Sequence, residues 1–281
     1  MPPVATLRRS SMRNVLACAL FALLAGAPPA FAELLAHRAV YDLDMSRRGG
    51  DIHGGSGRIA YELRGDACEG WATSVRQVTR LVGSDGDETT LDVSAATFET
   101  GASDAFDFRS QTRVDGRLVR SVEGRATREG ERLRIALRAP EKREILTDPE
   151  PTHFPLSHLR AVVEAARAGS RILAAPVFDG GDSGDELSDS LAVIGGEIAL
   201  PSDSPFPELA ESRRWRATVS YFDRDPIEGE RTPIYVLSFI LHENGVASDM
   251  ELDFGDFALR GAMTSFESFA ETDANADCPP R

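Results

Sequence analysis

Apolar and polar residues alternate along most of residues 35–140, a pattern typical of β-strands that bury one face. The clearest run places Leu133, Ile135 and Leu137 between the polar or small residues Arg134, Ala136 and Arg138. The same bias predicts strands at 40–45, 58–63 and 73–82, and again in the C-terminal third at 218–222, 234–241 and 246–254.

Turn sequences separate these runs. Asp115-Gly116 and Asn244-Gly245 each lie between apolar residues and predict hairpin turns, because these residue types accept positive φ. A glycine-rich turn (Gly54, Gly55, Gly57) is predicted before strand 58–63, and residues 180–184 and 201–207 are predicted to be loops.

One segment has helical spacing instead. Between 155 and 168 the apolar residues recur every three or four positions, namely Leu156, Leu159, Val162, Val163 and Ala166. Pro155 suits the first helical turn and Gly169 suits the position after the last turn. We therefore predict one amphipathic helix that covers one side of the sheet.

The organisation of the chain follows from these elements. No internal repeat or shift in composition divides residues 33–281, so we predict a single, mainly β domain with one large antiparallel sheet and an inserted helix. Because no second layer of helices is predicted, the sheet must curl or close to bury its apolar face.

The N-terminal 32 residues form a predicted signal peptide. Arg8, Arg9 and Arg13 precede an uncharged apolar segment at 15–25, and the small-residue pattern Ala30-Phe31-Ala32 ends the region. This is the secretory pattern, with cleavage expected between Ala32 and Glu33. A retained membrane anchor is the alternative, but Pro28 and Pro29 interrupt the apolar stretch before it is long enough to span a bilayer.

Charge excludes several classes of partner. The formal net charge is −14 and the pI is about 4.9, so nucleic-acid binding and a polybasic membrane anchor are not expected. Removal of the signal peptide takes away three arginines and no acidic residue, which makes the mature chain more acidic still.

The run Gly181-Asp182-Ser183-Gly184 is similar to the sequence around the nucleophile of chymotrypsin-like proteases. A serine nucleophile needs a histidine that is itself oriented by a carboxylate, and no histidine here has the sequence context of those proteases. We interpret the run as an acidic turn and predict no catalytic residues.

Metal and cofactor sites are not predicted either. The acidic residues Asp179, Asp182, Asp185 and Glu186 do not have the spacing of a calcium-binding EF-hand loop. The five histidines (37, 53, 153, 158, 242) lack zinc-binding spacing, and His153 and His158 would point in different directions on a helix.

Two cysteines, Cys68 and Cys278, remain after signal cleavage. An oxidising compartment permits a disulfide bond between them, and their spacing matches no CxxC motif. Two reduced, buried thiols are the alternative, which the polar surroundings of Cys278 near the C-terminus disfavour.

Nine segments, taken in order, resemble the EipB-type periplasmic cell-envelope integrity family of α-proteobacteria, long catalogued as a domain of unknown function. They are Ala36–Leu43, Gly57–Ile59, Ala67–Gly70, Thr152–Leu159, Val177–Gly180, Pro233–Tyr235, Asn244–Val246, Met250–Phe257 and Cys278. The resemblance implies a β-spiral, an open curled sheet wrapped around a helix, and a disulfide at positions matching Cys68 and Cys278. It also implies a periplasmic location, a role in envelope integrity without an assigned catalytic activity, and a link to a periplasmic tetratricopeptide-repeat protein.

We therefore expect a non-enzymatic periplasmic factor, without a cofactor, that binds a protein, peptide or lipidic partner. The alternatives are an envelope hydrolase that acts on peptidoglycan or lipid, a lipid or lipoprotein carrier, and a purely structural interaction scaffold. The inner face of the curled sheet is the expected place for an acyl chain or an extended peptide.

Export predicts a defined mature chain. The intact mass of the periplasmic protein should correspond to a chain that begins at Glu33. A mass that still includes residues 1–32 would contradict the predicted cleavage.

The Cys68–Cys278 bond predicts a loss of stability when both cysteines are replaced by serine. The bond would close a loop over most of the mature chain, so loop-closure entropy gives an upper limit of about 5 kcal/mol. The melting temperature should fall and protease sensitivity should rise. Thiol titration of the denatured secreted protein should detect no free thiol, and two thiols would refute the bond.

Overall fold

The computed structural model describes residues 34–181, 183–199, 205–224 and 231–269. The predicted signal peptide and Cys278 lie outside the described residues, so cleavage and the Cys68–Cys278 bond stay predictions. Within the described ranges, no helix is long and apolar enough to cross a membrane.

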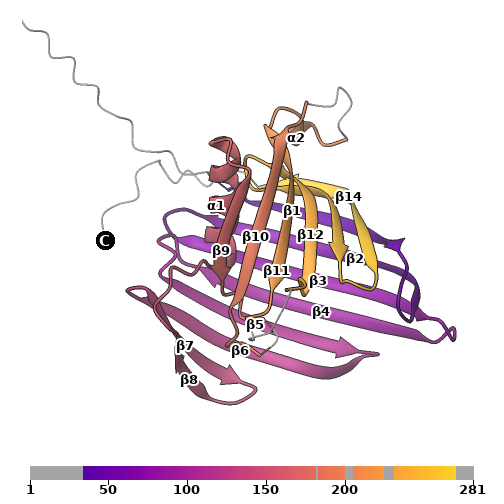
Figure 1. The fold of residues 1–281 in the computed structure, drawn as a ribbon, viewed down its shortest axis with the longest axis horizontal. Coiled ribbons are helices and arrows are strands. Elements are labelled where there is room, and N and C mark those ends of the chain that lie inside the picture. The colour runs from indigo at the N-terminus through magenta and orange to yellow at the C-terminus, as the bar shows by residue number, and fades with distance from the viewer. Residues whose placement is uncertain (1–33, 182, 200–204, 225–230, 270–281) are drawn as a thin grey trace, which may run out of the picture. The chain divides into compact units, whose positions relative to one another are not determined.

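The described part of the chain forms fourteen strands in one sheet and two helices (Figure 1). The first eight strands are β1 (His37–Arg47), β2 (Ile52–Asp66), β3 (Gly70–Gly83), β4 (Glu88–Glu99), β5 (Ala105–Val114), β6 (Arg117–Glu129), β7 (Arg132–Ala139) and β8 (Arg143–Leu146). The others are β9 (Ile172–Val177), β10 (Ser188–Glu197), β11 (Arg214–Phe222), β12 (Tyr235–His242), β13 (Ala247–Asp253) and β14 (Ala258–Ser268). The helices are α1 (Pro155–Arg167) and the short α2 (Pro207–Ala210).

The sheet consists of two meanders that meet in its middle. Strands β1 to β8 form the N-terminal meander and β9 to β14 the C-terminal meander, and β14 pairs antiparallel with β1. The two edges are therefore β8 and β9, which follow one another in the chain and are connected by the segment that contains α1. The predicted mainly β class, with one large open antiparallel sheet, is confirmed.

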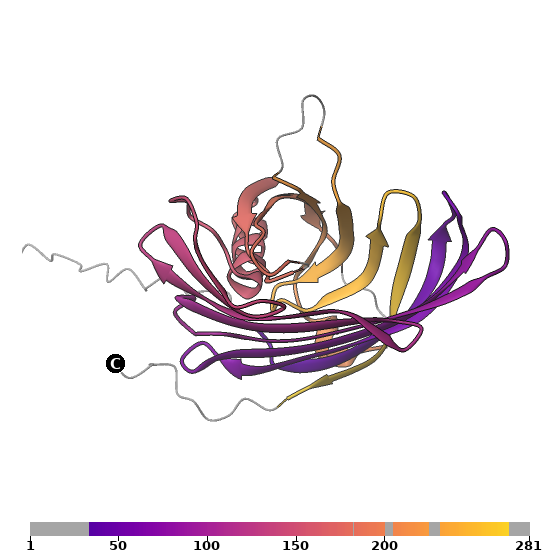
Figure 2. The same ribbon diagram turned by 90° about the horizontal axis from the view of Figure 1, so that it is seen from below.

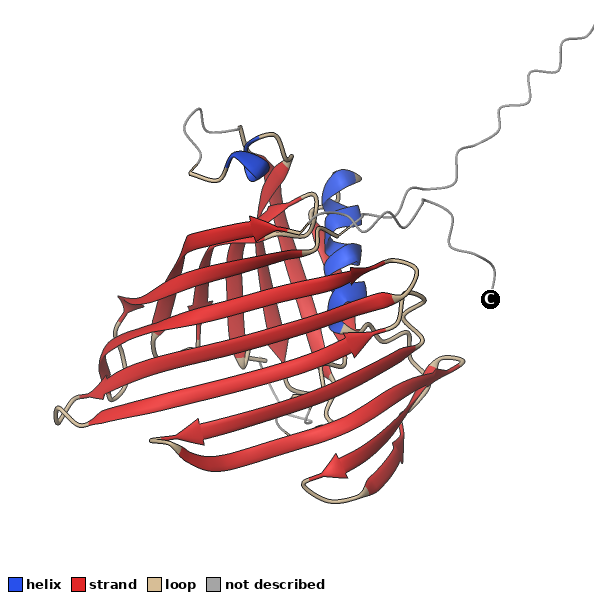
Figure 3. Cartoon of the chain, turned by 180° about the vertical axis from the view of Figure 1, so that it is seen from behind, coloured by secondary structure: helices blue, strands red, loops and turns tan. Residues whose placement is uncertain are grey.

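The two meanders differ in curvature. Figure 2 shows the C-terminal meander and α1 forming a tight curl over one face of the broader N-terminal meander. Seen from behind, the long strands of the N-terminal meander make one continuous layer with α1 beyond it (Figure 3). A sheet of this size would expose its apolar face if it stayed flat, and curling buries that face.

Helix α1 fills the curl. It covers the predicted segment, and Gly169, with φ +74°, follows its C-cap residue Ala168. Val162 and Val163 are buried and Leu159 packs beside them, as the helical spacing predicts. They contact a main core drawn from both meanders, which includes Ala39, Tyr41, Leu43, Ala192, Ile194, Trp215, Ala217, Val219, Phe239, Leu241 and Leu259.

A phenylalanine cluster holds the curl against the N-terminal meander. Phe106 of β5 stacks on Phe154, immediately before α1, with ring centroids 5.2 Å apart. Phe108 meets Phe178, immediately after β9, edge to face at 5.5 Å. Each such aromatic pair contributes roughly 0.5–1.5 kcal/mol beyond the burial of its area.

Glu99, at the end of β4, anchors the N-terminus of α1. Its carboxylate accepts hydrogen bonds from the amides of Leu156 (2.9 Å) and Ser157 (3.0 Å), and from the Ser103 hydroxyl (2.7 Å). Only 1% of the Glu99 side chain is exposed, and burial raises its pKa. The first amides of a helix have no partner within the helix, so this carboxylate from the N-terminal meander satisfies two of them.

One turn prediction was wrong. Gly54, Gly55 and Gly57 lie within β2 rather than before it, and the chain turns at 49–51 instead. Gly57 is needed because β3 approaches closely: an added Cβ would lie 2.4 Å from the carbonyl oxygen of Val78. Pro207, predicted to end a loop, begins α2.

The anchor predicts a large effect of Glu99→Ala on stability. The substitution leaves two buried helix amides without an acceptor, which should lower the free energy of unfolding by about 2–4 kcal/mol. Glu88→Ala is the matched control on the same strand, because Glu88 forms an exposed ion pair with Arg80 at 3.2 Å. Its effect should stay below about 1 kcal/mol. Equal denaturation midpoints for the two variants would contradict the role of Glu99.

Candidate functional site

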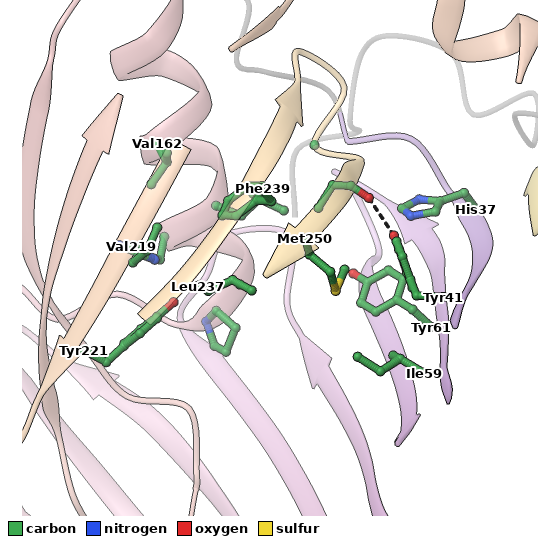
Figure 4. A pocket seen from close by; sticks show the side chains of 15 residues that line it. His37, Tyr41, Ile59, Tyr61, Val162, Val219, Tyr221, Leu237, Phe239 and Met250 are labelled. Atoms are coloured by element: carbon green, nitrogen blue, oxygen red, sulfur yellow. Dashed lines mark hydrogen bonds between the residues drawn. The ribbon is translucent and has the colours of Figure 1, made fainter. Parts of the chain in front are cut away.

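A pocket of about 250 Å³ lies between α1 and the curled sheet, and we call it the inner pocket (Figure 4). Its walls come from α1, β1, β2, β11, β12 and β13. Most of the lining is apolar, with Ile59, Leu159, Val162, Val219, Leu237, Phe239 and Met250. The polar lining residues are His37, Tyr41, Tyr61, His158 and Tyr221.

Strand and helix periodicity explain how the sequence builds these walls. Tyr41 on β1, and Ile59 and Tyr61 on β2, point to the inner face because residues two apart share a face of a strand. His158 and Val162 lie one helical turn apart on α1 and therefore face the same way. The walls thus combine segments that are far apart in the sequence.

Polar groups of the lining are largely occupied within the protein. The Tyr41 hydroxyl donates to the carbonyl of Ala247 at 2.7 Å, and burial raises the pKa of Tyr41 well above its usual value. His37 Nδ1 donates to the carbonyl of Leu35 at 2.6 Å, which leaves its Nε2 as an acceptor. Burial also lowers the pKa of His37, so this ring is neutral at pH 7.

His158 is engaged in the same way. The Ser190 hydroxyl donates to the carbonyl of Ala175 at 2.8 Å, so His158 Nε2, at 2.9 Å from Ser190 Oγ, is the donor of the second bond. Burial and, to a smaller extent, neighbouring His153 lower the pKa of His158 to about 4. His158 donates a hydrogen bond to the serine, whereas the base of a nucleophile-activating pair accepts one from it.

A second histidine–serine pair lies outside the pocket. His242 Nε2 is 3.0 Å from Ser248 Oγ, whereas its buried Nδ1 has no hydrogen-bond partner among the described residues. Burial lowers the pKa of His242 to about 4. A hydrolytic triad places a carboxylate on this second nitrogen to orient the ring, and the described residues supply none.

His153 differs from the sequence-based expectation. It precedes α1 and pairs with Val177 at the end of β9, so it is not part of the helix. Its ring centroid is 6.1 Å from that of His158, which makes the two histidines neighbours. No group of three or more potential metal-ligating residues occurs among the described residues.

The acidic loop at 179–186 has a packing role. Gly184 adopts φ +83°, and an added Cβ would lie 2.5 Å from Val122. Asp179 accepts a hydrogen bond from the Gly181 amide, and Asp185 pairs with Arg143, the first residue of β8. Asp182 lies outside the described residues. The two ends of the loop therefore fold against the N-terminal meander.

The sequence predicts an inner surface of the sheet, but it does not identify the residues that line this pocket. Tyr41 and His158 fall within the segments that resemble the family, yet neither carries a recognisable motif. The available signal was the alternation along β1 and β2 together with the helical spacing of α1. These patterns do not predict which strands face α1, because that depends on how the sheet curls.

Comparisons with known proteins agree with this architecture. The family model described as EipB-like matches residues 28–270. The chain is 32% identical over 240 residues to the cell envelope integrity protein EipB of Brucella abortus (strain 2308), which covers 84% of this chain and 85% of that protein. A crystal structure of a beta-barrel-like protein from Brucella abortus, described as a domain of unknown function, superposes with a TM-score of 0.77 at 32% identity. The match covers 85% of this chain and 99% of that one. The family resemblance of the sequence is thus confirmed, and the chain belongs to the EipB-like family.

Proposed function

We propose that this chain is a non-enzymatic periplasmic factor that maintains cell-envelope integrity by binding an apolar ligand in the inner pocket. The relative from Brucella abortus, whose name is cell envelope integrity protein EipB, supports the role and a location in the envelope. The predicted signal peptide supports export. A periplasmic tetratricopeptide-repeat protein, implied by the family resemblance, is the protein partner that we propose.

The apolar character of the lining is the observation that supports an apolar ligand. Aliphatic and aromatic side chains form most of the walls, while Tyr41, His37 and His158 direct hydrogen bonds to other protein groups. A ligand with several polar groups would find few free partners there. Apolar pockets with a small number of polar groups are typical ligand sites.

Size favours a single alkyl chain. The inner pocket, at about 250 Å³, is larger than the ~150 Å³ cavities that take up benzene and slightly smaller than typical small-molecule sites of ~300–1,000 Å³. One alkyl chain fits this volume better than a two-chain lipid does.

Hydrolysis is the competing function. Both histidine–serine pairs lack an orienting carboxylate among the described residues, and both histidines have a pKa of about 4. We therefore expect no turnover of ester substrates or purified peptidoglycan. Turnover that is lost in Ser190→Ala or Ser248→Ala would instead favour hydrolysis as the function.

The pocket predicts that filling it weakens ligand binding. In Val219→Phe the larger ring would displace several methylene groups of an alkyl chain, which should weaken binding of dodecanol about tenfold or more. Val219 is 3% exposed and lines the pocket, whereas Val193 on neighbouring β10 is 49% exposed, so Val193→Phe is the matched control. Binding is measured by isothermal titration, after circular dichroism has shown that both variants are folded.

Leu237→Trp provides a second filling variant if Val219→Phe does not fold, because the half-buried Leu237 of β12 also lines the pocket and pairs with Val219. Wild-type protein that binds no dodecanol, and that carries no lipid detectable by mass spectrometry after native purification, would overturn the proposed function.

A further inference from the structure

Two buried hydrogen-bond donors beside the inner pocket have no partner among the described residues. They are Trp71 Nε1 and Arg160 Nη2. The indole and guanidinium N–H groups only donate, so both require an acceptor. A buried donor without one costs about 1–3 kcal/mol, and most buried polar groups in native proteins are paired.

These groups lie together. Trp71 and Thr73 are two residues apart on β3 and share its inner face. The guanidinium carbon of Arg160, on α1, lies 6.0 Å from the centroid of the Trp71 ring. Trp71 is 2% exposed, and Arg160 is largely buried as well. An acceptor placed between β3 and α1 would therefore meet both donors at once.

The donors adjoin the inner pocket. Tyr61 and Leu159 line the pocket, and both also pack against a small cluster that contains Trp71. The Thr73 hydroxyl is a neighbour of the Tyr61 hydroxyl and lowers the pKa of Tyr61, which burial raises to about 12. Tyr61 and Leu159 thus contact both the apolar pocket and the cluster that contains Trp71.

Local charge favours an anion at this place. Burial lowers the pKa of Arg160, because the guanidinium has lost much of its hydration, and the nearby Glu99 carboxylate partly compensates. Glu99 is itself engaged by the amides of Leu156 and Ser157.

We infer that the ligand of the inner pocket is a single-chain amphiphile with an anionic head group, a carboxylate or a phosphate monoester, that accepts hydrogen bonds from Arg160 and Trp71. This inference rests on the proposed function. Guanidinium groups bind both kinds of oxyanion through paired hydrogen bonds. Because both donor atoms are covered by protein atoms, the Arg160 side chain has to rotate to receive the head group.

The test compares three ligands that share one alkyl chain: dodecanoate, dodecyl phosphate and dodecanol. Binding to the full mature protein is measured by isothermal titration at about pH 8, where the carboxylate is ionised. Both anions should bind wild-type protein at least about tenfold more tightly than dodecanol does. If only one anion is preferred, that result identifies the head group of the class.

Two substitutions test the donors. Arg160→Met removes the charge and keeps an apolar stem, so the preference for anions over dodecanol should fall below about threefold while dodecanol binding stays unchanged. Trp71→Phe removes the indole N–H together with the five-membered ring and keeps a phenyl ring, so anion binding should weaken several-fold while dodecanol binding stays nearly unchanged. Arg167→Met, on the same helix near its C-terminal end, is the control and should leave all three affinities unchanged.

The outcomes separate the two proposals. Equal affinity of wild-type protein for dodecanol and both anions would overturn the anionic head group and leave the apolar ligand in place. A preference for anions that persists in both Arg160→Met and Trp71→Phe would also overturn it, because the head group would then bind elsewhere. If none of the three ligands binds, the proposed function itself fails. If Arg160→Met does not fold, the anion preference of Trp71→Phe alone tests the anionic head group.

Discussion

The pairing of β1 with β14 determines most of the architecture, because it joins two meanders that would otherwise each have two exposed edges. The pairing runs from His37 opposite Ser268 to Arg47 opposite Ala258, with two irregularities in register. It leaves β8 and β9 as the edges of a single sheet. The inner face of β1 also supplies Ala39, Tyr41 and Leu43 to the main core, so the seam between the meanders lies against α1 and not at the periphery.

The position of α1 follows from this seam. One face of the helix packs into the curl of the C-terminal meander, while its N-terminus is held by Glu99 from the N-terminal meander. Phe154 and Phe178 add contacts to β5 on the same side. With both its face and its end fixed, the helix does not move inward to fill the remaining space. The inner pocket is the volume left between a helix held in this way and strands that curl away from it.

Local signals in the sequence were sufficient for the elements that depend on local chemistry. The helix occupies the predicted residues, and Asp115 and Gly116 both take the positive φ that a tight hairpin turn requires, +50° and +78°. Strands β10 and β14 were not predicted. Their small and polar residues, such as Ser190 and Gly261, are selected by close packing and give a weak hydrophobic pattern. The family resemblance indicated the curled sheet more directly than periodicity did.

Local signals in the sequence could not predict the candidate site. Glu99 is 57 residues from the amide of Leu156 that it binds, and nothing near either residue marks the pair. The same holds for Trp71 and Arg160, whose proximity depends on how β3 and α1 cross. An unpaired donor is visible only once all of its neighbours are placed, so sequence alone could not have suggested an anion there.

The central position of the two terminal strands has a consequence for how the protein is made. Among the described strands, the first, β1, pairs on one side with the last, β14, more than 200 residues later. Until β14 emerges, β1 presents an open edge, and the main core lacks one of its walls. Such an intermediate is prone to pair with other chains. The domain therefore becomes stable only when β14 has been made, and its yield depends on how long the open edge of β1 stays protected until then.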